Sequence, residues 1–518
     1  MKIVVGVVVF GLAVACGDQA WNGQGADAGD AGVVLTQDAM AFGDSAADAA
    51  TCSEMRCSAD LHQVIGCSDE VVQTCPPDLA CAPGGKCVAP CDGAAANQSA
   101  VGCDFYGAMP APDSTAADSC YTVLVANTWS TPIDVQVEWN GIVTSGWNVG
   151  HLVQPNGSLG PLQNGKLNPG EVGAYFLAAM DSHKAFWTSC PGTPAISTTY
   201  THVDGSGIGH AFHITTSAPV VAYDMYPYGG ALSYITSASL LLPTPTWGTN
   251  YVAADGYART AGAGSPYVQI IAAEDDTQVT IAPTADIVGG TGVAPAAKGQ
   301  PQTYALDKGE LLQIFQNEEL AGSPIASNKP ITVFGGASCA DVPTQSGYCD
   351  SLHQQLPPVQ MLGSEYVAVR YRNRGTAEES VPWRFVGAVD GTTLTFDPPQ
   401  TGAPATLAQG QLVELWSSAA FRVTSQDDAH PFYVSGHMTG CLSAPTSNYD
   451  GDPDYVNVVP PKRWLGSYLF LTDATYGSTN LVFVRSKAKD GTFKDVNLDC
   501  VGTLGGWTPI GSDAYEYT

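Results

Sequence analysis

The segment Gly309-Glu-Leu-Leu-Gln-Ile-Phe315 follows a pattern that the chain repeats three times, with the same spacing between its first glycine and its last aromatic residue. Its counterparts are Gly170-Glu-Val-Gly-Ala-Tyr-Phe176 and Gly410-Gln-Leu-Val-Glu-Leu-Trp416. Each copy reads as a turn glycine followed by a strand that ends on an aromatic residue, and the alignment predicts that Trp416 belongs to the core. A segment that recurs in this way indicates repeated structural units.

Two further patterns recur downstream of each copy. A strand with proline near its start comes first, at Pro219-Val-Val-Ala-Tyr, Pro330-Ile-Thr-Val-Phe and Pro431-Phe-Tyr-Val-Ser. A loop then closes on a second signature, with copies at Leu242-Pro243 with Gly248 and Tyr251, Leu356-Pro357 with Gly363 and Tyr366, and Val459-Pro460 with Gly466 and Tyr468. Each unit offers about six short strands in roughly 100 residues, which is typical of an antiparallel β-sandwich.

We therefore predict a mainly β fold of tandem antiparallel β-sandwich-like repeats, preceded by a small disulfide-rich module. A β-propeller-like ring is the alternative, although propeller blades are usually shorter. The predicted β repeats are 120–245, 246–360 and 361–462, with a partial fourth repeat at 463–518. The partial repeat lacks its glycine-led and proline-led strands, as a fragment would.

Residues 52–119 form the predicted disulfide-rich module. Such a density of cysteines in an exported chain indicates disulfides that replace a small core. The module's cysteines are Cys52, Cys57, Cys67, Cys75, Cys81, Cys87, Cys91 and Cys103, and their pairing is left open. Proximity and the repeat suggest Cys120–Cys190, Cys339–Cys349 and Cys441–Cys500 for the others.

The N-terminus carries export features. Lys2 precedes an apolar stretch, Ile3 to Val14, that is shorter than the roughly 20 residues needed to span a bilayer. Ala13-Val14-Ala15-Cys16 resembles the lipobox of bacterial lipoproteins, although Leu12 lies one place further from the cysteine than usual. We predict a lipoprotein signal at 1–16 with a lipidated Cys16, and an ordinary secretory signal is the alternative.

The location that follows is the bacterial outer membrane or cell surface, with membrane contact through the lipid anchor only. Residues 17–51, rich in Gly, Ala and Asp, are predicted to be a disordered acidic tether. The chain has 20 basic and 49 acidic residues, a formal net charge of −29. This charge repels phosphate backbones and excludes nucleic acid as an expected partner.

One stretch suggests a metal site. Asp450, Asp452 and Asp454 alternate as at the start of a calcium loop, so calcium is the one cofactor candidate. Pro461 replaces the glutamate that an EF-hand has at position twelve, and an ordinary acidic turn is the competing interpretation.

Three histidines also lie close together in the sequence. His210 and His213 would point to opposite faces of a single strand, and with His202 they are expected in a solvated loop rather than on a metal ion.

No motif for catalysis is present. The chain lacks a G-x-S-x-G elbow, an H-E-x-x-H helix and a phosphate-binding glycine loop, so we predict that it is not an enzyme. Trp129, Trp147 and Trp187 have no counterparts in the later units, and they are candidates for either burial or exposed contacts.

Four segments resemble the IgGFc-binding protein N-terminal domain family: KPITVFGGASC (329–339), CDSLHQQLPPVQMLGSEYV (349–367), GDPDYVNVVPPKRW (451–464) and YLFLTDATYGSTNLVFV (468–484). The resemblance covers roughly 120–518. The stretch SAVGCDFYGA (99–108) resembles the Cys-rich lead that precedes this domain in some bacterial surface proteins. The resemblance implies an extracellular binding or adhesive role and supplies no catalytic residues.

The function that we expect is therefore a non-enzymatic cell-surface binding or adhesion lipoprotein that presents repeated β-domains to a protein or glycan partner. The loops that close on Leu242-Pro243, Leu356-Pro357 and Val459-Pro460 would form its contact surface, with Cys339–Cys349 stapling one of them. The alternatives are a self-associating structural envelope protein and a calcium-supported extracellular hydrolase.

Overall fold

The computed structural model describes residues 5–11, 55–66, 70–154, 156–180, 188–233, 235–260, 262, 264–444, 451–468, 470, 472, 476, 479–488, 490–499, 501–512 and 516–518, with the backbone alone for 5–11 and 231. The predicted lipid site at Cys16 and the tether at 17–51 lie outside these ranges, as do Cys52, Cys67, Asp450 and Cys500. The fold is mainly β, as predicted. No helix in the described part of the chain is long and apolar enough to cross a membrane.

The first unit, residues 102–247, is built on a nine-stranded sheet with the order β10-β9-β15-β8-β13-β11-β12, in which β7 and β16 also pair with β15. A short helix, α2 (Gly146–Val149), connects β10 to β11. The strands are β7 (Gly102–Gly107), β8 (Tyr121–Asn127), β9 (Val135–Trp139), β10 (Ile142–Ser145), β11 (Gly150–Val153), β12 (Leu159–Pro161), β13 (Val172–Ala178), β15 (Phe212–Tyr226) and β16 (Ser237–Leu241).

The second unit, residues 248–362, has an eight-stranded sheet with the order β14-β21-β18-β22-β19-β20, and β17 and β23 also pair with β22. One of its strands, β14, comes from the sequence of the first unit and pairs with β21. The strands are β14 (Gly207–His210), β17 (Gly248–Val252), β18 (Pro266–Ala272), β19 (Thr277–Ile281), β20 (Gln302–Leu306), β21 (Glu310–Phe315), β22 (Pro324–Ala340) and β23 (Asp350–Leu356).

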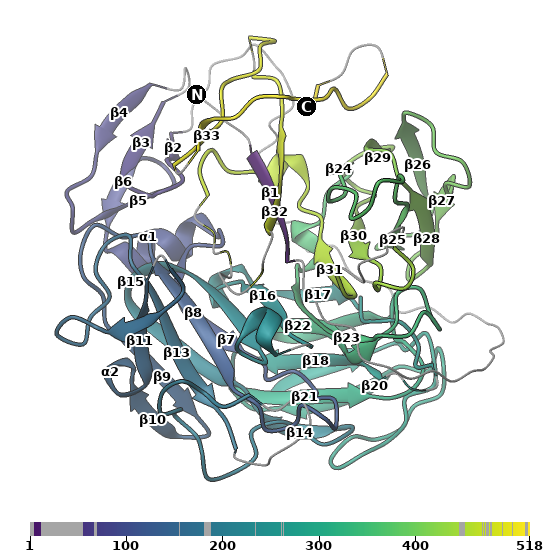
Figure 1. Ribbon diagram of the computed structural model, residues 1–518, viewed down its shortest axis with the longest axis horizontal. Coiled ribbons are helices and arrows are strands. Elements are labelled where there is room, and N and C mark those ends of the chain that lie inside the picture. The colour runs from purple at the N-terminus through teal and green to yellow at the C-terminus, as the bar shows by residue number, and fades with distance from the viewer. Residues whose placement is uncertain are drawn as a thin grey trace.

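The third unit, residues 363–464, has two four-stranded sheets. Their orders are β24-β29-β26-β27 and β28-β25-β30-β31. The strands are β24 (Glu365–Ala368), β25 (Val381–Gly387), β26 (Thr392–Asp397), β27 (Thr406–Leu407), β28 (Leu412–Ser417), β29 (Phe421–Ser425), β30 (Phe432–Met438) and β31 (Asp454–Asn457). Figure 1 shows the units following one another around the molecule, from blue through teal to green.

In each unit, the segment that contains the proline changes its pairing partners near that proline. In the first unit, β15 pairs with β9 before Pro219 and with β8 and β16 after it, while its pairing with β7 shifts register across the proline. In the third unit the same path is split into β29 and β30, with Pro431 between them. Because proline lacks an N–H to donate to a ladder, it is tolerated where a strand leaves one set of partners for another.

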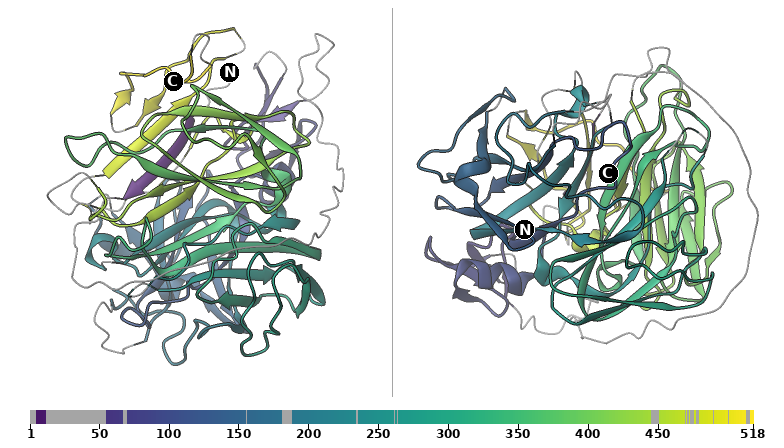
Figure 2. Two further views of the ribbon diagram at one scale, coloured as in Figure 1. Left: turned by 90° about the vertical axis from the view of Figure 1, so that its right-hand side faces the viewer. Right: turned by 90° about the horizontal axis from the view of Figure 1, so that it is seen from below.

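The N-terminal module contains α1 (Pro90–Asn97) and five short strands: β2 (Arg56–Cys57), β3 (Gln63–Ile65), β4 (Val71–Thr74), β5 (Ala80–Ala82) and β6 (Lys86–Val88). Disulfides join Cys57 to Cys81, Cys75 to Cys87 and Cys91 to Cys103. The last of these ties α1 to β7, and α1 also contacts β15. The right-hand view in Figure 2 shows the module against the first unit, away from the green strands of the third.

The first unit begins earlier than the predicted boundary at residue 120. Strand β7 lies inside the predicted cysteine-rich module, yet it pairs with β15 just as β17 pairs with β22 in the second unit. The sequence composition does not change between the disulfide module and the β unit that follows it. The predicted boundary was placed from the distribution of cysteines alone, and it therefore came too late.

The ends of the chain meet in a small sheet. Strand β1 (Val5–Gly11), inside the predicted signal segment, pairs antiparallel with β32 (Thr479–Arg485). The remaining elements are the strands β33 (Asn497–Leu498) and β34 (Gly502–Thr503) and the 3-10 turns η1 (Gly230–Leu232), η2 (Thr244–Thr246), η3 (Val359–Met361) and η4 (Pro461–Arg463).

Adjacent units are joined along β16, β23 and β31, which lie side by side without forming one ladder. Side chains make the bonds that a ladder would make. Gln355 on β23 receives the backbone N–H of Leu242 on its Oε1 at 2.6 Å, and its own backbone N–H donates to Ser239 Oγ at 2.8 Å. Asn457 on β31 donates to the carbonyl of Gln355 at 2.8 Å.

Candidate binding surface

The three proline loops are closed joints rather than exposed loops. A Cβ added to Gly248 would lie 2.7 Å from Cβ of Pro358, and one added to Gly363 would lie 2.4 Å from Cβ of Pro460. Gly102 makes the same approach to Pro243, at 2.4 Å. These glycines are needed because the chain crosses directly against a buried proline ring.

A tyrosine completes each joint. The Tyr251 hydroxyl accepts the Gly248 N–H at 3.2 Å and donates to the Ile331 carbonyl at 2.7 Å. The Tyr366 hydroxyl accepts the Gly363 N–H at 2.9 Å and donates to the carbonyl of Phe432 at 2.6 Å.

In the last unit the Tyr468 hydroxyl accepts the N–H of Leu465 at 2.7 Å, so Leu465, and not Gly466, is the counterpart of the two glycines. The ends of these loops are therefore used to close the units, and the buried glycines and tyrosines of the signature are not part of a contact surface.

The burial of the tryptophans differs in part from the expectation. Trp129 is buried and lies 4.3 Å from the ring of His62, whereas Trp147 in α2 is 62 % exposed. Trp416, which the alignment assigned to the core, is 40 % exposed and donates to Glu414 at 2.8 Å. It lies on β28, at the edge of its sheet, between the buried Leu415 and Ser417, so its side chain points away from the core. Trp187 lies outside the described residues.

Disulfides join Cys120 to Cys190 and Cys339 to Cys349, the same pairs that proximity suggests. Cys441 is also disulfide-bonded, and its partner is not among the described residues. The Cys339–Cys349 bond closes the turn between β22 and β23, which pair with each other.

The predicted calcium ligands are only partly placed. Asp452 is buried, Asp454 is partly buried, and both interact electrostatically with Asp350. Burial raises the pKa of Asp452 to about 7 and that of Asp454 to about 7, and burial followed by repulsion from Asp452 raises the pKa of Asp350. In the described residues, no group of three or more His, Cys, Asp or Glu is placed to hold a metal ion.

The three clustered histidines lie apart. His210 ends β14 and pairs with β21, whereas His213 lies on β15, so they do not share one strand. His213 Nε2 is 3.1 Å from Asp104 Oδ2, and its ring stacks on Tyr106 at 4.3 Å. The expectation of a solvated loop is wrong for His202, because its side chain is only 5 % exposed.

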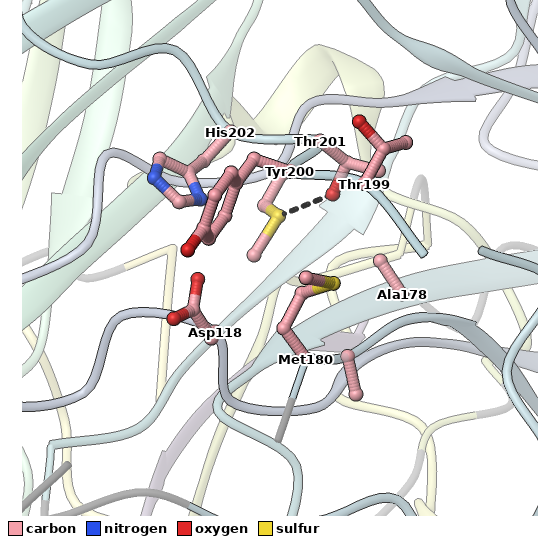
Figure 3. A pocket seen from close by; sticks show the side chains of 9 residues that line it. Asp118, Ala178, Met180, Thr199, Tyr200, Thr201 and His202 are labelled. Atoms are coloured by element: carbon pink, nitrogen blue, oxygen red, sulfur yellow. Dashed lines mark hydrogen bonds between the residues drawn. The ribbon is translucent and has the colours of Figure 1, made fainter. Parts of the chain in front are cut away.

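His202 belongs to a small hollow in the first unit (Figure 3). The hollow encloses about 170 Å³, its open mouth included. Its lining is formed by Met109, Asp118, Ala178, Ala179, Met180, Thr199, Tyr200, Thr201 and His202. These residues come from the loop before β8, the end of β13 and the loop before β14, and nothing in the sequence marks these segments as neighbours.

The hollow has a carboxylate on one side and an aromatic ring on the other. Asp118 is 4 % exposed, and its Oδ1 is buried with no hydrogen-bond partner among the described residues. Tyr200 is 58 % exposed, and Figure 3 shows its hydroxyl directed toward the carboxylate. The rings of Tyr200 and His202 meet edge to face at 5.4 Å.

The model of the family described as IgGFc binding protein matches residues 237–518, more than half of the chain. The chain belongs to this family. No curated protein and no solved structure matches the chain significantly.

The IgGFc binding protein family is a binding family rather than an enzyme family. The match begins at the first residue of β16 and leaves most of the first unit outside it. The first unit nevertheless repeats the contact between glycine and proline and the long proline-containing strand of the matched units.

Proposed function

We propose that this member of the IgGFc binding protein family is a non-enzymatic, surface-displayed protein that binds a protein partner through its first unit. The family match supports a binding role and a protein as the partner. The disulfides of the N-terminal module support an extracellular location, since such bonds persist in oxidising compartments.

One observation carries the choice of the first unit. Three exposed apolar side chains lie on the edge strand β10 and the adjoining α2, with the consecutive Ile142 and Val143 on opposite faces of the strand and Trp147 in the helix. A Cβ on Gly165 would lie 1.8 Å from the Trp147 ring, so the indole rests directly on the backbone of the neighbouring turn. An immobilised, exposed tryptophan beside aliphatic residues is typical of the anchor of a protein interface.

The strand also contributes its backbone. β10 is the last strand of its sheet and pairs only with β9 among the described strands. Its outer N–H and C=O groups are therefore available to an extended segment of a partner, which adds main-chain bonds to the apolar contact.

The first test measures adhesion of cells that produce the full chain to surfaces coated with IgG Fc fragment, purified mucin or collagen. Wild type is compared with Trp147→Ala and with Val288→Ser, a matched loss of an exposed apolar side chain in the second unit. We expect retention on a protein coat to fall at least about tenfold for Trp147→Ala and to stay unchanged for Val288→Ser.

Retention equal to that of cells lacking the chain, on every coat, would sink the proposal. Oligomers of the purified chain without any outside ligand would then favour the self-associating envelope protein. Retention on glycans stripped from mucin, but not on any protein, would replace the protein partner with a glycan.

A second test addresses the anchor. Whole cells are labelled with a membrane-impermeant reagent, and wild type is compared with Cys16→Ser. We expect wild type to be labelled and bound to the cell, and the variant to be released. Wild type that is shielded from the reagent, or a variant that stays attached, would place the chain inside the envelope.

A further inference from the structure

We propose that the hollow of the first unit binds a primary ammonium group, such as the side chain of a lysine presented by the protein partner. This inference rests on the proposed function and names the chemistry of one contact. The hollow lies outside the part of the chain that the family model matches.

A cation bound in the hollow would stabilise the buried carboxylate of Asp118. Its Oδ1 is buried and has no hydrogen-bond partner in the part of the chain that the structure describes, and the neighbouring Tyr226 hydroxyl donates to the carbonyl of Ala116 instead. The backbone of Asp118 is held in the left-handed region, with φ at 73°, and its carbonyl accepts the Met180 N–H at 2.9 Å. Burying an unpaired carboxylate is costly, so a site that keeps one in place is stabilised by an incoming cation.

The walls suit an ammonium group on an alkyl stem. The exposed Tyr200 ring offers its face to a cation, and the thioethers of Met109 and Met180 offer a polarisable apolar surface to methylene groups. The Thr201 hydroxyl lies 2.9 Å from Met109 Sδ, which fixes that wall. The His202 ring, whose Nε2 is 3.2 Å from Asp204 Oδ1, supports Tyr200 from the side.

Other ligand classes fit less well. A divalent cation prefers six or more oxygen ligands, whereas the lining supplies one carboxylate, and its other side-chain oxygens are the neutral hydroxyls of two threonines and Tyr200. Small-molecule sites usually have volumes of roughly 300–1,000 Å³, well above the size of this hollow. A chain with a net charge of −29 also attracts basic surfaces over a distance, which favours a lysine-bearing partner.

The experiment titrates the full chain with Nα-acetyl-lysine amide and follows binding by calorimetry. Asp118→Asn removes the charge and keeps the shape, and asparagine tolerates the left-handed backbone at this position. Asp276→Asn is the matched control, because Asp276 also has a positive φ, at 54°, but is exposed in the second unit. We expect Asp118→Asn to weaken binding at least about tenfold and Asp276→Asn to leave it unchanged.

Two further arms sharpen the result. The neutral analogue with an acetylated side-chain amine should not bind, and Tyr200→Leu, at an exposed position, should weaken binding without lowering the melting temperature. A titration with n-butylammonium distinguishes a free amine from a lysine side chain as the ligand. Equal affinity for n-butylammonium and the lysine derivative indicates a free amine, and tighter binding of the lysine derivative indicates a peptide.

Equal binding of wild type and Asp118→Asn, or of the charged and acetylated probes, would overturn the inference. The proposed function is tested separately by Trp147→Ala. If wild type and Asp118→Asn bind the probe equally while Trp147→Ala loses adhesion, only this site is refuted. If Asp118→Asn loses the probe while Trp147→Ala keeps full adhesion, only the choice of the β10 surface is refuted.

Discussion

The second and third units each contact the preceding unit through a pair of polar side chains at equivalent positions, and the two pairs differ in charge. In the second unit Gln269 on β18 is in register with Gln313 on β21, and in the third Arg384 on β25 is in register with Glu414 on β28. Gln313 and Glu414 occupy the same place in the repeated glycine-led segment. One backbone frame therefore carries a neutral pair at one joint and a charged pair at the next.

Each pair makes hydrogen bonds to the unit before it, although Oε1 of Gln269 has no hydrogen-bond partner among the described residues. Gln269 donates to the Met109 carbonyl at 2.8 Å, and Gln313 donates to the carbonyls of Val203 and Gly205 at 2.8 and 2.7 Å. The neutral joint thus uses backbone groups that are already present.

The charged joint needs additional side chains. Arg384 makes a two-point contact with Glu319, at 2.8 and 3.1 Å, and its guanidinium lies 4.0 Å from the centre of the Tyr257 ring. Asp255 is buried beside this group, and burial followed by repulsion from Glu319 raises the pKa of its carboxyl. At these matched positions the second joint carries several ionisable groups and the first joint carries none, although the first joint buries His353 3.3 Å from Asp224 elsewhere along its length. This difference predicts which of the two pairs is more sensitive to substitution.

The largest effect is expected from Arg384→Gln. The variant leaves Glu319, Glu414 and Asp255 without their cation, and the free energy of unfolding should fall by about 3–5 kcal/mol, as measured by denaturant titration. The double variant Arg384→Gln with Glu414→Gln copies the neutral pair of the second unit and should recover at least about 1 kcal/mol. A double variant as unstable as the single one would contradict the equivalence of the two joints.

The pH dependence of stability should distinguish the joints next. The fold keeps Asp452 and Asp454, beside the second joint, protonated up to about pH 7, whereas the unfolded chain ionises them near 3.8. The folded state therefore binds more protons in this window, and the free energy of unfolding should fall as the pH rises through it, on the order of a few kcal/mol in total.

Thermal unfolding between pH 4 and 8 measures this slope. Asp454→Asn should flatten it, and the exposed Asp276→Asn should not. His437 acts in the opposite direction below its ordinary value of 6.5, because burial lowers its pKa and the fold holds it neutral, so His437→Gln should steepen the fall. A slope that Asp454→Asn leaves unchanged would exclude this carboxyl as the cause.

A smaller loss is expected at the neutral joint. Gln313→Leu leaves the carbonyls of Val203 and Gly205 without a donor, and it should lower the free energy of unfolding by about 1–3 kcal/mol in denaturant titration. Gln278→Leu, at an exposed position on β19, is the control and should be nearly neutral. If Gln313→Leu costs as much as Arg384→Gln, the charge of the second joint is not what sets its sensitivity.

The smallest effects should be equal in both units. Tyr251→Phe and Tyr366→Phe each remove the hydroxyl that closes a proline joint, and each should cost about 1 kcal/mol in the same titration. Tyr200→Phe, which removes an exposed hydroxyl, should cost close to nothing. A large difference between the two buried variants would show that the closing bond is not equivalent in the second and third units.

Much of the fold could be predicted from the sequence because its repeats depend on local backbone rules. The proline-led strands mark where a strand changes partners, and the second signature places Gly248 and Gly363 where a proline ring leaves no room for a Cβ. The alignment assigned Trp416 to the core because it matched residue types along one strand. It could not show that this strand lies at the edge of its sheet.

The candidate site could not be predicted, because Asp118, Met180 and Tyr200 come from three separate loops. None of these segments carries a recurring motif, and an unpaired carboxylate has no signature in a sequence. The proline loops were assigned to the surface for a related reason: loop composition indicates exposure on average, but here the loops pack against the start of their own unit.

The sequence by itself determined the spacing and internal order of the repeated strand segments, because glycine, proline and alternating apolar residues constrain the backbone over a few neighbours. The tertiary structure alone decided which polar side chains meet, at the hollow around Asp118 and at the joints of Gln269 and Arg384. Those contacts join residues far apart in the chain, and their geometry exists only after the units have packed against one another.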